Sequence, residues 1–262
     1  MTSSNDPLDS ARGGRPKAWL VVARDIVHAM YQQGMRPGDR YLSEAEGIKH
    51  HGVGRGTYRE AVRFLEQQGV IVMRSGVGGG PEIAQPGWPN LASTVALLLQ
   101  FADAPLLTIL DARVAIEPGM AELAAANATT AELVRMEIDL DAVERGLGVY
   151  RTFSAAYLAY WNDLAASTHN ALLAFLSPAL RAIVNSAGFT PNELYRERIL
   201  QRLRSIHAAV AAHDGETAFA RMRELEVEYR SRLVEGYPRQ VERVISWADL
   251  QQALFTSAET PA

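Results

Sequence analysis

The sequence contains no cysteine among its 262 residues. Disulfide bonds, thiolate zinc sites and cysteine nucleophiles are therefore excluded, and the composition suits a reducing cytoplasm. Long hydrophobic runs are also lacking: residues 91–110 come closest to a membrane span, but Gln100, Asp103 and Pro105 interrupt them. Residues 1–14 are polar, lack the apolar segment of a signal peptide and are expected to form a flexible arm. We therefore expect a cytoplasmic protein without a membrane-spanning helix.

Positive charge is not in excess either, since the chain carries a net charge of −4. Its distribution is uneven: residues 1–85 hold 11 Lys and Arg against 9 Asp and Glu, whereas the remainder holds 15 against 21. Positive charge therefore collects in the N-terminal third, where a nucleic-acid-binding surface is to be sought. Hydrophobic residues make up 48% of the chain, which is enough for a substantial core in each of two domains.

Residues 15–85 have the pattern of three short helices followed by a β-hairpin. Apolar residues recur with helical spacing from Trp19 to Met30 and predict the first helix. Ser43 and Glu46 form a capping-box pattern that begins the second helix, and Gly52 is placed to end it. This order is typical of a winged helix-turn-helix domain.

The third helix carries an arginine at every fourth residue: Arg55, Arg59 and Arg63. This spacing stacks the three guanidinium groups on one helix face. The opposite face has the periodicity of a core helix, with Tyr58, Ala61, Val62 and Leu65. An arginine stripe alone is more commonly a solvated surface, but the capped helix before it and the hairpin after it favour a DNA-recognition helix.

The N-terminal residues of a recognition helix lie against base edges in helix-turn-helix proteins. We therefore assign Arg55, Thr57 and Arg59 to base contacts, because arginine pairs with O6 and N7 of guanine and threonine contacts bases or phosphates. Arg63 lies a turn further on and is assigned to a phosphate, a contact that positions the protein without reading sequence.

A glycine-rich tip at residues 74–81 separates the strand-like residues 70–73 and 82–84. The tip lacks the Gly-Lys-Ser/Thr ending of a phosphate-binding loop, and a proline follows it where such a loop would lead into a helix. We interpret it as a wing that approaches the DNA backbone or minor groove, with a plain flexible hairpin as the alternative. The further predicted DNA contacts are Arg40, Ser43, Arg74, Ser75 and Gly76.

The C-terminal part is predicted to be an all-α antiparallel bundle at residues 91–255, so the whole chain is mainly α. Residues 86–90 contain two prolines and a glycine and are predicted to be the linker, and residues 256–262 a tail. The core of such a bundle offers room for a small molecule. Predicted helices cover residues 91–102, 106–127, 130–146, 150–168, 171–188, 192–213, 215–235 and 239–254.

The segments Met35–Arg40, Leu42–Glu44, Val53–Ala61, Leu65–Ile71 and Gly76–Gly80 together resemble the GntR family of bacterial transcription regulators. The resemblance implies a dimeric DNA-binding protein with an effector-responsive C-terminal domain. It also implies DNA contacts by Arg55, Thr57, Arg59 and residues 74–76. Three positions depart from the family pattern: Leu42 replaces a proline, Ala45 an arginine and Gly54 a serine, and glycine is a poorer helix N-cap.

Residues 110–125, 164–170 and 214–218 resemble the all-helical FCD domain of the FadR subfamily. Many such domains bind a divalent metal through an Asp and a His one turn apart on one helix and a His on each of two later helices. The corresponding positions hold Tyr157, Trp161, Leu203 and Leu225, none of which is an ordinary ligand for a divalent cation. The histidines His169, His207 and His213 fall outside these positions. We therefore predict that no metal or other cofactor is bound.

Two explanations remain for this apolar and aromatic replacement. Either the pocket accepts a hydrophobic effector, such as a fatty acid, an acyl-CoA or a sterol-like molecule, or it has filled in as core. Arg113, which matches the family pattern, holds an effector carboxylate or phosphate in the first case; the alternative is a buried ion pair, for example with Glu117. We favour a hydrophobic acid. The predicted effector contacts are Arg113, Tyr157, Trp161, Asn185, Tyr195, Leu203, His207, Leu225 and Tyr229.

The leading hypothesis is a cytoplasmic transcription repressor that binds a palindromic operator on double-stranded DNA as a homodimer and is released by an effector. A constitutive DNA-binding regulator, whose helical domain serves only for dimerisation, is the first alternative. A helical small-molecule enzyme is the second, but the sequence offers it no nucleophile motif, credible metal site or cofactor loop. We therefore expect no enzymatic activity.

Overall fold

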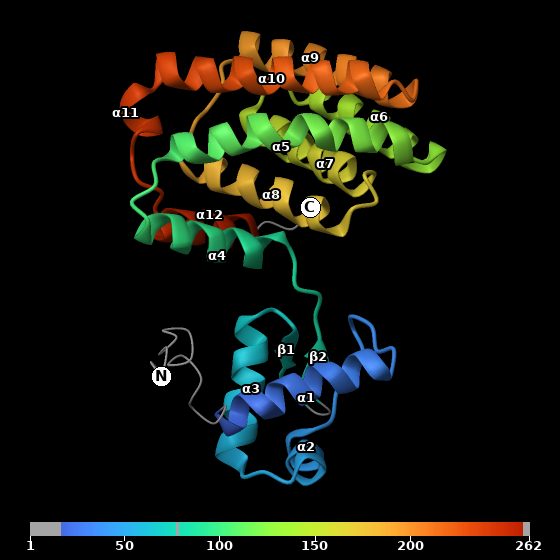
Figure 1. Cartoon of the computed structure of the whole chain (residues 1–262), viewed down its shortest axis with the longest axis vertical. Coiled ribbons are helices and arrows are strands. Elements are labelled where there is room, and N and C mark those ends of the chain that lie inside the picture. The colour runs from blue at the N-terminus through green and yellow to red at the C-terminus, as the bar shows by residue number, and fades with distance from the viewer. Residues whose placement is uncertain (1–16, 77–78, 259–262) are drawn as a thin grey trace, which may run out of the picture. The chain divides into compact units, whose positions relative to one another are not determined.

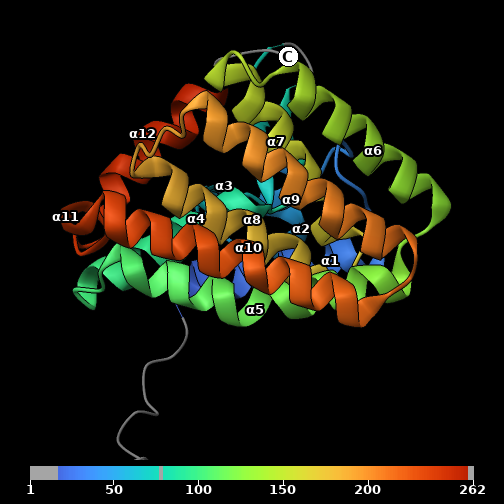
Figure 2. The ribbon, with the colours of Figure 1, turned by 90° about the horizontal axis from the view of Figure 1, so that it is seen from above.

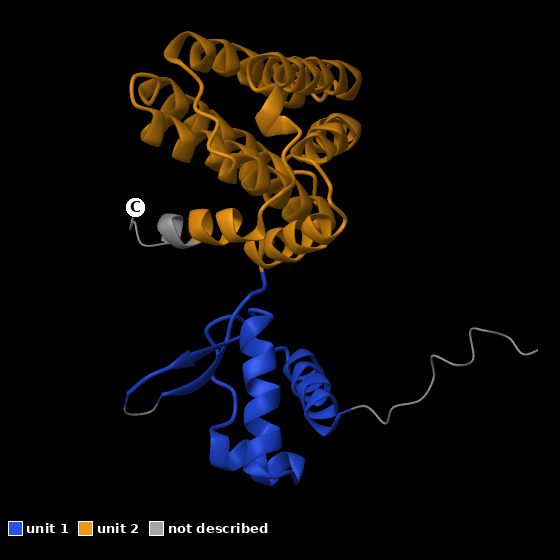
Figure 3. Ribbon diagram, turned by 90° about the vertical axis from the view of Figure 1, so that its left-hand side faces the viewer, with its two compact units in different colours: residues 1–86 blue, residues 87–262 orange. Residues whose placement is uncertain are grey.

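The computed structural model describes residues 17–76 and 79–258. The chain divides into two compact units, residues 1–86 and 87–262 (Figure 3). The predicted arm at residues 1–14 lies outside the described residues, as do residues 259–262 of the predicted tail. No helix in the described ranges is long and apolar enough to cross a membrane.

The first unit has the predicted order of three helices and a hairpin (Figure 1). The strands are antiparallel, with a register that runs from Ile71 opposite Ile83 to Arg74 opposite Gly80. The elements are α1 (Ala18–Gln32), α2 (Glu44–His51), α3 (Arg55–Gln67), β1 (Ile71–Arg74) and β2 (Gly80–Ile83). The winged helix-turn-helix expected from the sequence is confirmed.

Local sequence signals explain where α2 and α3 begin and end. Ser43 and Glu46 form the predicted capping box at the start of α2: the Glu46 amide donates to Ser43 Oγ and the Ser43 amide to Glu46 Oε2. Gly52 ends α2 with φ +62°, a left-handed conformation that glycine adopts at little cost. Gly54 precedes α3 without a side-chain cap. Burial of Tyr58, Ala61, Val62 and Leu65 then anchors α3 against α1 and β1.

All the secondary-structure elements of the second unit are helices in the part that the structure describes. In Figure 1, α9 and α10 form one layer, α5, α6 and α7 the next, α8 follows, and α4 and α12 close the stack. Figure 2 shows α10 alongside α5. The elements are α4 (Trp88–Phe101), α5 (Leu106–Asn127), α6 (Thr130–Arg145), α7 (Tyr150–Ala166), α8 (Ala171–Ser186), α9 (Glu193–Ala211), α10 (Gly215–Gly236), α11 (Pro238–Val241) and α12 (Trp247–Ala258).

The single helix predicted at residues 239–254 is wrong, because two shorter helices, α11 and α12, occupy this region. The segment between them pairs with the loop before α5: the Leu106 amide donates to the Arg243 carbonyl at 3.0 Å, and the Ile245 amide to the Ala104 carbonyl at 3.2 Å. These bonds satisfy backbone groups that a continuous helix would have paired internally. Helix α12 also extends into the predicted tail, as far as Ala258.

The linker predicted at residues 86–90 is shorter than expected, because α4 already begins at Trp88. Pro89 sits in the first turn of α4, where a backbone N–H has no helical partner and its absence costs little. The Gly87 amide donates to Asn90 Oδ1 at 3.2 Å and fastens this turn. Proline at this position therefore starts a helix.

Candidate nucleic-acid interface and ligand cavity

The arginine face of α3 is exposed, as its spacing predicts. Arg55, Arg59 and Arg63 are exposed and Thr57 is half-buried, whereas Tyr58 on the opposite face is buried. Because the apolar side of α3 is held by the core of the first unit, its polar side is presented as a rigid surface. The predicted base-contacting residues Arg55, Thr57 and Arg59 therefore share one short stretch of helix.

Glu44 at the start of α2 contacts two of these arginines. Its Oε1 atom lies 3.1 Å from Arg55 Nε and accepts a hydrogen bond from Arg59 Nε at 3.0 Å. Both contacts use Nε, so the carboxylate engages the two guanidinium groups where they join their stems. Sequence reasoning missed this residue, because the pairing joins positions on two different helices.

The wing carries a second charged pair. Arg74 on β1 donates from Nε and Nη2 to Glu82 on β2 at 3.1 and 3.0 Å, and this hydrogen bonding holds the pKa of Glu82 below its usual range. Arg40 forms an isolated β-bridge with Glu82, which brings a second exposed basic residue to the hairpin. Ser75 and Gly76 are exposed, and Gly76 has φ +104° at the bend of the hairpin.

Ser43 has a structural role besides its predicted DNA contact. Its hydroxyl donates to Glu46 Oε2 at 2.6 Å and its oxygen accepts from the Glu46 amide. This bonding holds the pKa of Glu46 below its usual range. The Ser43 hydroxyl proton is therefore already engaged by Glu46, and the predicted DNA contact would require it to change partner.

The second unit contains a cavity of about 540 Å³ formed by α7, the segment between α8 and α9, the start of α9 and the C-terminal part of α10. Polar groups enter it from Ser154, Asn185, Thr190, Asn192, Arg232 and Glu235. Its aromatic lining consists of Tyr150, Phe153, Tyr157, Phe189, Tyr195, Tyr229 and Tyr237. Four of the predicted effector residues, Tyr157, Asn185, Tyr195 and Tyr229, lie here.

Other cavity residues were missed from the sequence. Tyr150, Phe153 and Tyr157 share one face of α7 at helical spacing, a signal that was available. No comparable spacing in the sequence points to Arg232. Its guanidinium carbon lies 3.9 Å from the centroid of the Tyr195 ring. Burial raises the pKa of Tyr195 and its hydroxyl finds no partner among the described residues. The cavity lining thus combines aromatic rings with one cationic side chain, Arg232, and one acidic side chain, Glu235.

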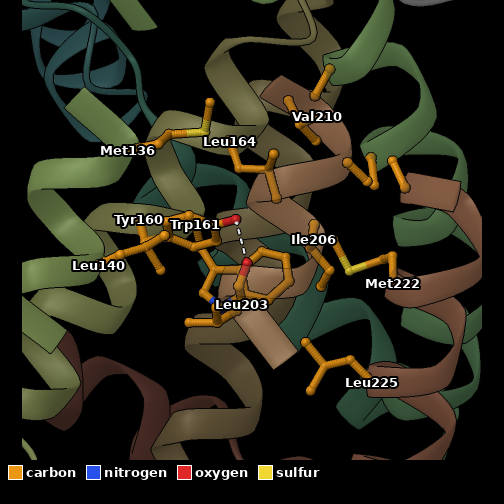
Figure 4. Packing of buried hydrophobic residues seen from close by; sticks show 14 of the residues in the cluster. Met136, Leu140, Tyr160, Trp161, Leu164, Leu203, Ile206, Val210, Met222 and Leu225 are labelled. Atoms are coloured by element: carbon orange, nitrogen blue, oxygen red, sulfur yellow. Dashed lines mark hydrogen bonds between the residues drawn. The ribbon is translucent and has the colours of Figure 1, made fainter. Parts of the chain in front are cut away.

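The remaining predicted effector residues do not line this cavity. Trp161, Leu203 and Leu225 belong to the packed core, where the Tyr160 hydroxyl donates to the Leu203 carbonyl (Figure 4). His207 pairs with Glu137, its Nε2 lying 3.0 Å from Glu137 Oε2. The prediction for Trp161, Leu203 and Leu225 rests on their positions in the FCD pattern, and a position along a helix does not say which side chains the neighbouring helices cover.

Arg113 forms the buried ion pair that was the alternative to effector binding. Its Nε lies 3.5 Å from Glu117 Oε1, and its Nη2 lies 2.8 Å from Glu226 Oε2. Arg181 on α8 completes a four-charge cluster by donating to Glu117 and, at 3.0 Å, to Glu226 Oε1. Ser177 Oγ donates to Glu117 Oε1 at 3.0 Å. All four charged side chains are at most 3% exposed.

The cluster is never net negative. Burial raises the pKa of Glu117, an effect that the nearby Glu226 carboxylate reinforces. Although burial also opposes ionisation of Glu226, Arg113 and Arg181 hold the pKa of that carboxyl well below its usual range. With both carboxylates ionised the cluster is neutral, and protonation of Glu117 makes it positive.

The residues at the four positions that the FCD resemblance assigns to metal ligands do not fit a divalent cation. Trp161, Leu203 and Leu225 offer no lone pair of the kind a metal needs, and the Tyr157 hydroxyl accepts a hydrogen bond from Arg181 Nη1 at 2.9 Å. Nowhere in residues 17–76 and 79–258 do three or more His, Cys, Asp or Glu gather as a metal-binding group. The metal-free state itself stays a prediction.

Comparison with known proteins gives one consistent result. The FCD domain matches residues 108–226. An uncharacterised HTH-type transcriptional regulator of Mycobacterium tuberculosis is 28% identical, over 82% of this chain and 89% of its own. The galactonate operon transcriptional repressor of Escherichia coli is 25% identical, over 76% of this chain and 87% of its own. The structure of a Streptococcus agalactiae GntR protein shares the fold with a TM-score of 0.65 at 20% identity, covering 81% of this chain and 99% of that chain.

Proposed function

The chain is a transcriptional regulator of the GntR family with an FCD domain, and we propose that it is a ligand-responsive repressor that binds a palindromic operator as a homodimer. It acts on DNA in the cytoplasm, and a small hydrophobic acid in the cavity of the helical unit releases it. The repressor role is supported by the galactonate operon repressor among its relatives.

The exposed arginine face of α3 is the observation that carries the DNA-binding role. A helix of this width enters the major groove, where an arginine pairs in bidentate fashion with O6 and N7 of guanine. Glu44 supports this reading because it engages Arg55 and Arg59 through Nε. A guanidinium held at Nε has a fixed orientation, which lowers the entropy lost when its terminal nitrogens meet a base.

The cavity of the helical unit supports the effector-responsive hypothesis over a domain that serves only for dimerisation. Its volume of about 540 Å³ lies in the range typical of small-molecule sites. Aromatic rings provide most of its apolar wall, Arg232 supplies a positive charge and Glu235 a negative one. An apolar body with one acidic group, such as a fatty acid, an acyl chain of an acyl-CoA or a sterol-like acid, matches this lining.

The DNA-binding role is tested by separating base readers from phosphate contacts. With an operator obtained by in vitro selection, Arg55→Ala and Arg59→Ala each cost about 1–3 kcal/mol of binding free energy and relax the preference at one guanine. Arg63→Ala is the matched control: it weakens binding to all sequences alike and reduces the salt slope by about 1. Fluorescence anisotropy at several salt concentrations measures both quantities. Unchanged sequence preference in both Arg55→Ala and Arg59→Ala would sink the proposed readout.

The effector role is tested on the same complex. Fatty acids, acyl-CoAs and steroid acids are added to the wild-type protein bound to its operator, and release is followed by anisotropy. At least one acid is expected to weaken operator binding, and operator DNA must weaken binding of that acid by the same factor. If no apolar acid changes the operator affinity, the constitutive regulator becomes the better description.

A further inference from the structure

The position of Arg181 suggests what has replaced the metal of the FCD pattern. Its guanidinium carbon lies 3.2 Å from the centroid of the Trp161 ring, and its Nη1 donates to the Tyr157 hydroxyl at 2.9 Å. Tyr157 and Trp161 stand at the first two of the four positions assigned to metal ligands. A permanently charged guanidinium therefore contacts both residues that replace the Asp and His of that pattern.

The surrounding carboxylates hold this cation in place. Arg181 donates to Glu117 on α5 and to Glu226 on α10, so its charge is compensated by residues of two other helices. Arg113 shares both carboxylates, which balances the cluster. The Arg181 side chain is therefore held in the core, because its movement into solvent would leave buried carboxylate charge unpaired.

Tyr157 connects this buried cluster with the cavity. It lies on α7, its side chain lines the cavity, and its oxygen already accepts a hydrogen bond from Arg181. The hydroxyl proton is therefore available for a second bond. A hydroxyl that accepts from a cation is polarised and becomes a stronger donor. The Tyr157 hydroxyl thus presents to the cavity part of the positive charge that a metal ion would otherwise supply.

We propose that the Arg181–Tyr157 pair takes the place of the metal as the anchor for an effector carboxylate, with Tyr157 donating its hydroxyl hydrogen bond to a carboxylate oxygen. This inference rests on the proposed function and goes further, since it names the anchoring atom and makes effector binding independent of metal. The apolar remainder of the effector lies against the aromatic walls. An alcohol of equal length lacks the anionic acceptor and binds less tightly.

The test compares acids with alcohols of the same carbon skeleton. The probes are octanoate against octanol and 3-phenylpropanoate against 3-phenylpropanol, titrated by calorimetry into the full-length protein in EDTA. The wild type prefers at least one acid over its alcohol by 10-fold or more, and Tyr157→Phe loses this preference while its affinity for the alcohol stays within 2-fold. Tyr160→Phe is the matched control: the same change on the same helix, at a hydroxyl that bonds the Leu203 carbonyl in the core. It retains the preference.

Several results overturn this anchor. An acid preference that survives Tyr157→Phe removes Tyr157 from the role. Acid binding that EDTA abolishes and zinc or manganese restores reinstates a metal, and failure of every acid to bind excludes the anchor as described. Operator binding and its dependence on Arg55 and Arg59 are measured separately, so the DNA-binding role stands or falls on its own data. Circular dichroism checks that both tyrosine variants remain folded.

Discussion

At the scale of single residues, Glu44 and Arg181 make the contacts on which the proposed functions of the two units depend. The arginine stripe of α3 is visible in the sequence, but only the fold brings Glu44 within 3.1 Å of Arg55 and 3.0 Å of Arg59. Likewise, the sequence shows that Tyr157 and Trp161 replace metal ligands, whereas the guanidinium of Arg181 against both of them comes from a separate helix. The sequence shows which charged residues are present, and only the packing shows which of them are paired with one another.

Asp139 on α6 offers a pH-dependent test at this scale. Burial raises its pKa to about 6, with Asp163 adding to the effect and Arg135 opposing it, and one carboxyl oxygen has no partner among the described residues. Because the folded protein holds this proton more tightly than the unfolded chain, the contribution to stability is full at low pH and is lost as pH rises through about 6. Asp139→Asn imitates the protonated form and is expected to raise Tm at pH 7.5 by a few degrees, roughly what ~1 kcal/mol gives in a domain of this size.

Differential scanning fluorimetry between pH 4 and pH 8 measures this effect. The gain of Asp139→Asn over the wild type shrinks as pH falls below about 6 and is small near pH 4. Asp141→Asn, the same change at an exposed position of α6, serves as the control and shows no such trend. A stabilisation by Asp139→Asn that is equal at all pH values contradicts the assigned cause.

At the scale of elements, the contact between α2 and α3 depends on a missing side chain. Gly47 is buried in α2, and a Cβ atom there would lie 2.3 Å from atoms of the Tyr58 ring. Tyr58 is 1% exposed, so other residues of the core enclose its ring. The two helices therefore approach closely only because residue 47 is glycine.

Gly47→Ala is expected to destabilise the first unit by about 1–3 kcal/mol, although alanine favours helix formation. Gly56→Ala is the matched control, because that glycine lies in α3 with open space around it and gains about 0.5–1 kcal/mol from the same change. Chemical denaturation followed by circular dichroism measures both. Gly47→Ala also lowers operator affinity, since it separates α3 from its support. Equal stabilisation by both changes would show that α2 and α3 are not packed as described.

The helices themselves were largely predictable, and the exceptions are instructive. Local signals such as the Ser43 capping box and Gly52 act within one turn, so the sequence states them directly. The break between α11 and α12 was missed because its backbone bonds to Ala104 and Leu106, which lie far away in sequence. Pro118 lies inside α5 without ending it, since Glu117, Pro118 and Met120 are all buried and α5 packs against several neighbouring helices.

At the scale of the whole molecule, the proposed homodimer predicts how the operator is read. Two recognition helices related by a two-fold axis require two half-sites on the same side of the duplex. Scrambling one half-site is expected to cost at least 100-fold in affinity, and inserting five base pairs between the half-sites has a similar effect because it rotates one of them by half a turn. Inserting ten base pairs restores the face and recovers part of the affinity.

Anisotropy titrations with these four DNA duplexes provide the measurement, and sedimentation of the free protein and of the complex gives the stoichiometry. Two chains per intact operator are expected. A complex of one chain per operator that tolerates the five-base-pair insertion would exclude the proposed arrangement.

The sequence by itself determined the winged helix-turn-helix, the arginine face of α3 and the departure from metal ligands at Tyr157, Trp161, Leu203 and Leu225. These follow from caps, turn residues and helical periodicity, whose physical range is a few residues. Only the tertiary structure decided that Trp161, Leu203 and Leu225 are core while Tyr157 opens into a cavity, and that Arg113 is committed to an ion cluster. Burial and ion pairing depend on which helices meet, and here charges from α5, α8 and α10 meet across more than a hundred residues of sequence.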